Sequence, residues 1–184
     1  EFVESMQLRL AGSQTVSRPE FRERAPFEYT DVEGGYIARG NPNLERAKIW
    51  NADLGWEWYP APGDLVSAGF FYKHFDKPIE VINLPTSSGL LTTWDNADQA
   101  DLIGFEIEAR KGLSFILEDL KDLTFVGNFA YMESEVSIGD DPNSQQTNDK
   151  RPLQGQPEYL LNLGLLYESK PLGLNIGVFA STLG

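Results

Sequence analysis

The sequence predicts an all-β fold, an antiparallel up-and-down meander of about seven strands. Apolar and polar residues alternate along seven segments, and long and short connections alternate between those segments. The 184 residues include 17 Gly and 11 Pro, together with four Trp, seven Tyr and eleven Phe. This composition favours strands and turns over helices.

The clearest alternation lies at residues 49–58. One side of this predicted strand is apolar: Trp50, Ala52, Leu54, Trp56 and Trp58. The other side carries Asn51, Asp53, Gly55 and Glu57. A two-residue period places successive side chains on opposite faces of a sheet. The pattern suits a half-buried sheet of a soluble protein, or a transmembrane β-barrel whose apolar face meets lipid and whose polar face meets the lumen.

The predicted strands, taken in order, cover residues 6–17, 46–58, 65–75, 101–111, 123–137, 158–167 and 172–182. The third to sixth of these repeat the pattern of one apolar face. Their apolar faces include Phe70 and Tyr72, Phe105 and Ile107, Phe129 and Tyr131, and Leu163 and Leu165. A strand of about eleven residues tilted near 40° spans roughly 28 Å, close to the ~25 Å apolar band of outer-membrane barrels.

The connections differ in length in a regular way. Long segments rich in Gly, Pro, Asn and Asp follow the first, third and fifth strands, at residues 18–45, 76–100 and 136–157. Shorter segments follow the second, fourth and sixth, at residues 60–64, 112–122 and 169–173. In a meander, odd connections lie at one end of the sheet and even ones at the other. Bacterial outer-membrane barrels have this asymmetry, and a soluble sandwich has no physical reason to keep it.

Charge and cysteine content exclude several function classes. The net charge of −13 argues against binding to nucleic acid or to anionic headgroups, because both require Lys and Arg to meet phosphate. The absence of Cys removes disulfides and thiolate chemistry. The sequence predicts no catalytic residue, no cofactor and no metal ligand.

Several segments resemble the C-terminal barrel region of TonB-dependent outer-membrane receptors. They are TVSRPEFRERAPFEY at 15–29, RGNPNLERA at 39–47, IGFEIEARKGL at 103–113, GNFAYMESEV at 127–136 and RPLQGQPEYLLNLGLLYE at 151–168. The resemblance covers nearly the whole chain. It implies a 22-stranded barrel in the outer membrane of Gram-negative bacteria, occluded by an N-terminal plug domain. Such a receptor imports a scarce ligand, a ferric siderophore, cobalamin or an oligosaccharide, with energy passed on by TonB.

We therefore expect residues 1–184 to form one partial barrel domain, without the plug, the TonB-contacting segment or the final strand of the family. The resemblance implies four kinds of partner: outer-membrane lipid, the plug domain with the remaining strands, TonB, and a small-molecule ligand. It implies a receptor and transporter, not an enzyme.

Two alternatives remain open at this point. The first is a soluble β-sandwich that binds carbohydrate, with Trp50, Trp56 and Trp58 as a sugar-stacking platform. The second is an outer-membrane hydrolase that uses His74, the one histidine of the chain, as a base. No GxSxG element accompanies His74, so an imidazole at the membrane interface or facing a loop is the preferred interpretation.

Charged residues of the predicted strands share their polar faces: Asp53, Glu57, Lys73, Glu106, Glu108 and Arg110. They suit either a ligand path or a lumenal salt-bridge lattice that holds the wall and meets the plug, and we favour the lattice. The oxygen-rich segment 139–149 suggests calcium, but it lacks the EF-hand spacing and is predicted to be a solvated extracellular loop.

The block at residues 18–26 mixes arginines and glutamates, and Phe21 and Phe27 accompany them. One hypothesis makes it a ligand-contacting loop that folds over the pore. We favour the other, a self-paired base of the loop in which Arg18, Arg22 and Arg24 pair with Glu20 and Glu23, while both phenylalanines are buried.

Overall fold

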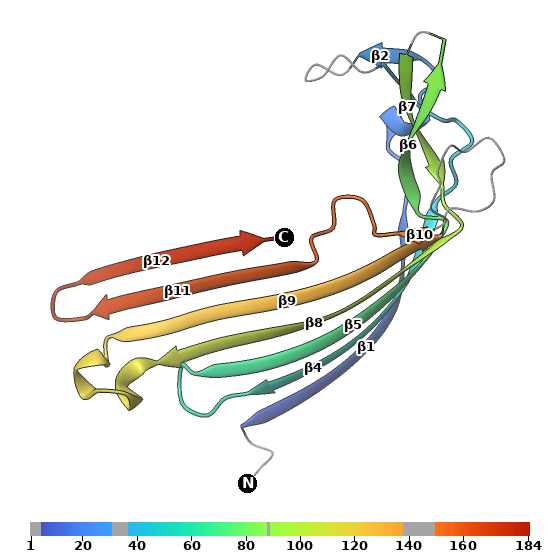
Figure 1. Ribbon diagram of the computed structural model, residues 1–184. Coiled ribbons are helices and arrows are strands. Elements are labelled where there is room, and N and C mark those ends of the chain that lie inside the picture. The colour runs from blue at the N-terminus through green and yellow to red at the C-terminus, as the bar shows by residue number, and fades with distance from the viewer. Residues whose placement is uncertain (1–4, 31–36, 88, 138–149) are drawn as a thin grey trace.

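The computed structural model describes residues 5–30, 37–87, 89–137 and 150–184 (Figure 1). Seven long strands form one curved sheet in sequence order, and each pairs antiparallel with the next. They are β1 (Met6–Ser17), β4 (Ala47–Trp58), β5 (Leu65–Asp76), β8 (Gln99–Gly112), β9 (Leu123–Ser137), β11 (Tyr159–Ser169) and β12 (Leu174–Leu183). The predicted meander is therefore confirmed.

The pairing register gives the sheet two faces of different character, which we call the apolar face and the polar face. Rows of paired residues in the middle of the sheet keep their character from strand to strand, whereas one row of the apolar face near its end, Trp50, His74, Asp101 and Glu135, is mixed. One of the middle rows of the apolar face is Leu10, Leu54, Phe70, Phe105, Tyr131 and Tyr159. The Phe105 ring lies 5.9 to 6.2 Å from those of Phe70, Phe129 and Tyr131. Trp50, Trp56 and Trp58 share this face, as predicted, and Asn51, Asp53 and Glu57 share the polar one.

Aromatic rings of the polar face lie over glycines of neighbouring strands. A Cβ added at Gly104 of β8 would stand 2.4 Å from Cζ of Phe71 and 2.7 Å from the Tyr131 carbonyl oxygen. A Cβ at Gly164 of β11 would stand 2.6 Å from the Phe179 ring. A Cβ at either position would have to displace the neighbouring ring, and at Gly104 it would also press on the β9 backbone.

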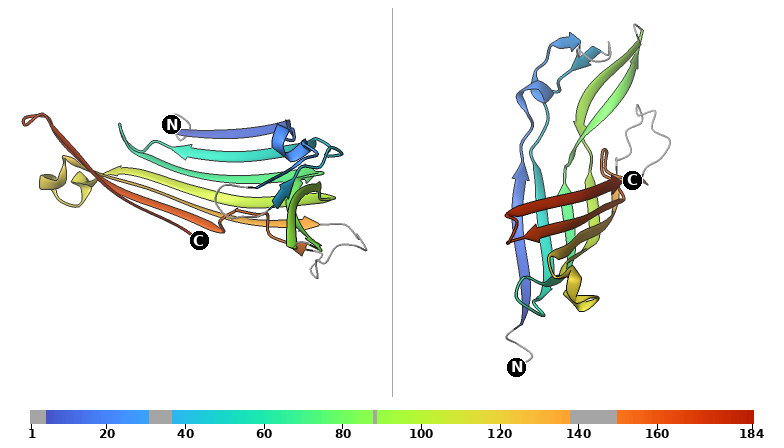
Figure 2. Two further views of the ribbon diagram at one scale, coloured as in Figure 1. Left: turned by 90° about the horizontal axis from the view of Figure 1, so that it is seen from above. Right: turned by 90° about the vertical axis from the view of Figure 1, so that its left-hand side faces the viewer.

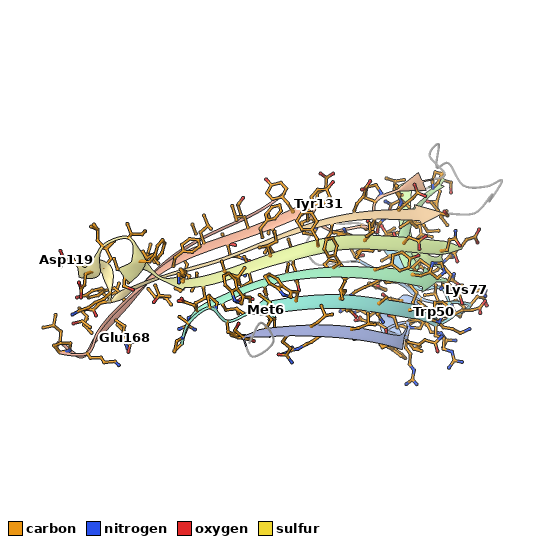
Figure 3. All side chains as sticks on the ribbon, turned by 90° about the horizontal axis from the view of Figure 1, so that it is seen from below. Met6, Trp50, Lys77, Asp119, Tyr131 and Glu168 are labelled. Carbon is orange, nitrogen blue, oxygen red and sulfur yellow. The ribbon has the colours of Figure 1, made fainter. Side chains whose placement is uncertain are left out.

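All three long connections lie at one end of the sheet, which we call the loop end; the shorter ones lie at the other, the turn end (Figure 2). In Figure 3, Trp50 and Lys77 mark the loop end, while Asp119 and Glu168 mark the turn end. The predicted asymmetry is confirmed. None of the helices in the described ranges is long and apolar enough to cross a membrane.

The long connections contain regular structure that the sequence analysis did not predict. The helix α1 (Phe21–Arg24) and strands β2 (Glu28–Thr30) and β3 (Ile37–Arg39) lie in the first connection, and the hairpin of β6 (Ile79–Thr86) and β7 (Gly89–Asn96) lies in the second. These strands form a second sheet in the order β2-β3-β7-β6. A further short strand, β10 (Lys150–Arg151), pairs with β9. The apolar and β-branched residues at 79–94, on either side of Thr-Ser-Ser-Gly, are a sequence pattern that could have predicted this hairpin.

The largest buried cluster sits at the loop end. Val136 of β9 is 0% exposed and packs with Ala97 and Ala100, and Phe75 and Leu153 cover the cluster. Phe75, Ala100 and Val136 are paired neighbours on the polar face. The base of the second and third long connections is therefore anchored on a small apolar core, although the face below it is polar.

The turn end is held by a charged contact. Asp64, between β4 and β5, lies 2.5 Å from the Lys111 ammonium and accepts a 3.0 Å hydrogen bond from the Gly112 N–H. These two interactions, the lysine first, hold the pKa of the Asp64 carboxyl below its ordinary value of 3.8. Two 3₁₀ helices, η1 (Leu113–Phe115) and η2 (Glu118–Leu120), follow in the connection between β8 and β9.

We predict that Gly104→Ala destabilises the sheet by about 1–3 kcal/mol, because the new methyl group must displace the Phe71 ring or the β9 backbone. Gly55→Ala is the matched control, since a Cβ there meets nothing within 4 Å on the same polar face. Denaturant unfolding of the full-length protein in detergent measures both changes. Equal midpoints for the two variants would contradict the packing argument.

Candidate functional site

The three long connections form the candidate site, because hydrogen bonds tie them to one another at the loop end. The first contact is a parallel pairing of β3 with β7, in which Ile37 is opposite Leu91 and Ala38 is opposite Thr92. The two strands belong to different connections, so this pairing joins the first connection directly to the second. The two connections therefore share one sheet (Figure 1).

Asn96, at the end of β7, is the centre of a second contact. Its amide nitrogen donates to the carbonyls of Glu45, at 3.1 Å, and Lys77, at 2.8 Å, and its amide oxygen accepts from the Glu45 N–H at 2.8 Å. Lys77 and Glu45 also form an ion pair at 2.5 Å. The hydrogen bond to Glu45 raises the pKa of Lys77. One asparagine thus fixes the base of the first connection against both ends of the second.

A third contact involves the backbone at residues 40 and 41. Asn41 donates its side-chain amide to the Trp94 carbonyl at 3.1 Å. The neighbouring Gly40 lies so close to the α1 segment that an added Cβ would stand 2.5 Å from the Arg22 carbonyl oxygen. Gly40 also donates its N–H to the Ala25 carbonyl at 3.0 Å. This close approach requires glycine and seats α1 against the segment between β3 and β4.

The third long connection joins the second through a buried ion pair. Arg151 of β10 lies 2.7 Å from the carboxylate of Glu80, whose side chain is only 8% exposed. Gln154 donates its side-chain amide to the Val81 carbonyl at 3.0 Å. Both contacts reach β6, so the second connection lies between the first and the third and is bonded to each.

Among the described residues, two hollows open at the loop end. One, of about 390 Å³, lies between the first and second connections, and its lining includes Arg39, Asn41, Pro42, Trp94 and Asp95. The other, of about 410 Å³, lies beside β8 and β9 and includes Tyr72, Asp101, Glu133, Glu135 and Arg151. The first offers a guanidinium, a carboxylate and apolar side chains within one cavity. It is a candidate binding site formed by the long connections.

The favoured structure of residues 18–26 is wrong. Phe21 is 83% exposed and Phe27 is 56% exposed, so neither is buried. Within the described ranges, no arginine of the block pairs with Glu20 or Glu23. Glu23 instead accepts a hydrogen bond from the Glu20 N–H, and Arg24 donates to the Pro42 carbonyl at 3.0 Å. The polar backbone groups of this block form hydrogen bonds at α1, and the rings of Phe21 and Phe27 remain exposed.

His74 has partners that the sequence could not show. It lies on the apolar face of β5, opposite Asp101 of β8, and its Nδ1 is 2.8 Å from the Asp101 carboxylate. Tyr72 donates to the same carboxylate at 2.5 Å, and the Trp50 ring lies 5.6 Å from the imidazole. Among the described residues, no serine or threonine hydroxyl forms a hydrogen bond with His74. The group is an aspartate-anchored imidazole without a nucleophile.

A continuous row of polar residues crosses all seven strands on the polar face. This polar row consists of Gln7, Glu57, Ser67, Glu108, Asn128, Asn162 and Ser181. Asn162 donates to Asn128 at 2.7 Å and accepts from Ser181 at 2.5 Å. At the other end, Arg9 pairs with Glu57 at 3.3 Å. Side-chain hydrogen bonds within the row therefore link β9, β11 and β12.

Among the described residues, the predicted salt-bridge lattice does not form. Glu57 alone of the six predicted charges makes an ion pair with another described residue. Glu106 packs over Gly69, where an added Cβ would stand 3.0 Å from its side chain. The residues opposite these six charges in the pairing register are all uncharged, for example Ala11 opposite Asp53 and Asn128 opposite Glu108. The predicted loop at 139–149 lies outside the described residues, and the remainder holds no group of three metal-ligating side chains.

Comparison with known proteins identifies the family. A family model described as "TonB dependent receptor-like, beta-barrel" matches residues 1–183. The chain belongs to this family. Its members are receptors and transporters of the outer membrane, not enzymes. No curated protein matches the sequence.

Solved structures share the fold. The ferric enterobactin receptor from Pseudomonas aeruginosa, in complex with enterobactin, is 18% identical with a TM-score of 0.68, over 100% of this chain and 26% of its own. The copper transporter OprC is 16% identical with a TM-score of 0.68, over 97% and 24%. The siderophore receptor PirA from Pseudomonas aeruginosa is 16% identical with a TM-score of 0.60, over 97% and 33%. The chain therefore spans only a quarter to a third of the length of these receptors.

We predict that Arg151→Met loosens the second and third connections, because it leaves the buried Glu80 carboxylate without its cation. The loss of local stability should reach about 3 kcal/mol. Hydrogen exchange of the β6 amides in the intact receptor measures it. The control is Arg39→Met, whose pair with Glu28 is exposed and 3.9 Å long, and which should cost no more than about 1 kcal/mol. Equal exchange in both variants would refute the distinction.

Proposed function

We propose that this chain is part of an outer-membrane active transporter that binds and imports a scarce ligand with energy supplied by TonB. The observation that carries the proposal is the family match over residues 1–183. The ligand classes of the family are ferric siderophores, cobalamin and oligosaccharides. Similar structures bearing the names of a ferric enterobactin receptor and a siderophore receptor favour the first class.

The two faces of the sheet support a place in a membrane. Exposed apolar side chains extend from β1 to β12 on one face, for example Leu10, Leu54, Ile107, Leu163 and Val178. A sugar-stacking platform would need an aromatic patch bounded by polar groups. Trp50, Trp56 and Trp58 instead belong to a continuous apolar face, which suits lipid. The soluble carbohydrate-binding alternative also required a β-sandwich, whereas the long strands form one open curved sheet.

Within this proposal each part of the chain has a task. The apolar face meets outer-membrane lipid, the polar row faces the lumen and the plug domain, and the two open edges pair with the remaining strands of the barrel. The long connections lie outside the cell and help to capture the ligand, with the cavity around Arg39 and Trp94 as the contact site. We expect the plug domain and the TonB-contacting segment to lie in other parts of the receptor.

The test is ligand uptake by cells. Deletion of the gene should abolish import of one labelled ligand among a ferric siderophore panel, cobalamin and oligosaccharides, and the intact receptor should restore it. Loss of TonB should abolish import to the same extent while leaving ligand binding at the cell surface. Undiminished import in the deletion strain for every ligand, or import independent of TonB, would overturn the proposal.

A replacement of His74 separates transport from hydrolysis. We predict that His74→Ala in the intact receptor leaves ligand import near the wild-type level, because the imidazole lies on the apolar face and has only Asp101 as a hydrogen-bond partner among the described residues. Surface expression, measured in parallel, is the control. A near-complete loss of import at normal expression would return the hydrolase alternative to consideration.

A further inference from the structure

Exposed apolar side chains gather in the connection between β8 and β9, at the turn end. Phe115, Ile116 and Leu117 are consecutive, and they are 67%, 56% and 61% exposed. The backbone of this turn is hydrogen-bonded: Ile116 donates to the Leu113 carbonyl at 3.0 Å, and Leu120 donates to the Leu117 carbonyl at 3.0 Å. The chain therefore presents three large apolar side chains on a fixed turn, where a polar linker would serve to join two strands.

The turn continues the apolar face of the sheet. Lys111 lies on that face, opposite Phe125 of β9. Its ammonium stands 5.5 Å from the centre of the Phe115 ring and contacts the Asp64 carboxylate. Phe115 is thus held over the apolar face by a cation–π contact, with the lysine charge balanced by aspartate. The ring extends the lipid-facing surface beyond the end of β8.

Neighbouring strands show that apolar surface persists beyond the level of Lys111. The next row along the same face is Leu123 of β9, Tyr167 of β11 and Ile176 of β12. Ile176 is 50% exposed, and Leu172, in the next turn, is 73% exposed. Two of the three short connections therefore carry large apolar residues beside a face that remains apolar.

Charges around the turn restrict what can cover it. Glu118, Asp119 and Asp122 follow the apolar residues, with Lys121 between them. This acidic rim would be repelled by an anionic lipid surface, but it is compatible with zwitterionic headgroups. The arrangement, apolar side chains beside the lipid-facing wall and carboxylates after them, matches a segment that lies in a membrane interface.

We propose that residues 113–117 insert into the periplasmic leaflet, among zwitterionic phospholipids, and anchor this part of the barrel at a fixed depth. The inference rests on the membrane placement in the proposed function. Phe115, Ile116 and Leu117 enter the acyl boundary, and Glu118 and Asp119 remain in water. Lys111 and Asp64 fix the direction in which the turn leaves the wall.

The test uses an environment-sensitive fluorophore on single cysteines of the intact receptor in phosphatidylcholine nanodiscs. The chain has no native Cys, and any elsewhere in the receptor are replaced first. The label at Ile116→Cys should be quenched by brominated acyl chains and be insensitive to aqueous iodide. Asp119→Cys, three residues further along the same turn, is the matched control and should show the reverse.

A third label, at Ile107→Cys on the apolar face of β8, separates the two proposals. Lipid quenching at Ile107 with iodide quenching at Ile116 would overturn the anchor and leave the membrane placement intact. Iodide quenching at both would overturn the membrane placement and the anchor together. The label at Ile116 could instead be protected from iodide in isolated outer membranes but accessible to iodide in nanodiscs. That result would indicate that a periplasmic protein covers the turn, and it would also overturn the anchor.

Discussion

Every backbone N–H and C=O of a strand that crosses lipid needs a partner in a neighbouring strand, because hydrocarbon offers none. This constraint forces the seven strands into one unbroken register, and the register in turn decides where every side chain lies. A slip of one residue in any strand would exchange its two faces and turn charge toward lipid. The uninterrupted apolar row through Leu54 and Phe105, and the polar row through Glu57 and Asn128, are the visible result. Glycines at 104 and 164 exist because the same register brings aromatic rings onto those positions.

The long strands were predictable because each carries its own signal, a strict two-residue period that does not depend on what lies beside it. Predicted and observed limits agree within two residues for all seven. The second sheet was not predictable in this way. Its parallel pairing joins Ile37 to Leu91, which are more than fifty positions apart, and strands of three residues are too short to show a period. The β6–β7 hairpin did have a local signal, an apolar and β-branched sequence on either side of a Ser-Gly turn.

Side-chain positions were predictable, but side-chain contacts were not. The polar face of the sheet was evident from alternation, but the partner of each charge depends on the stagger between strands, which composition does not reveal. Arg9 therefore meets Glu57, while Glu106 covers a glycine. His74 acquires Asp101 from a strand 27 positions away, through register alone. Residues 18–26 were misjudged because a capping box at Glu20 and Glu23 satisfies the backbone locally, so the carboxylates were not available for the arginines.

The bonding of the long connections affects how such a receptor can change over evolution. Surface loops usually tolerate insertions one at a time, because their ends are fixed and their middles touch nothing. Here an insertion before β3 would shift its pairing with β7, and a change in β6 would disturb Glu80 and with it Arg151. The three connections are therefore expected to evolve together as one set. Variation in ligand preference should arise by exchange or concerted change of the whole set, while the strands beneath drift independently.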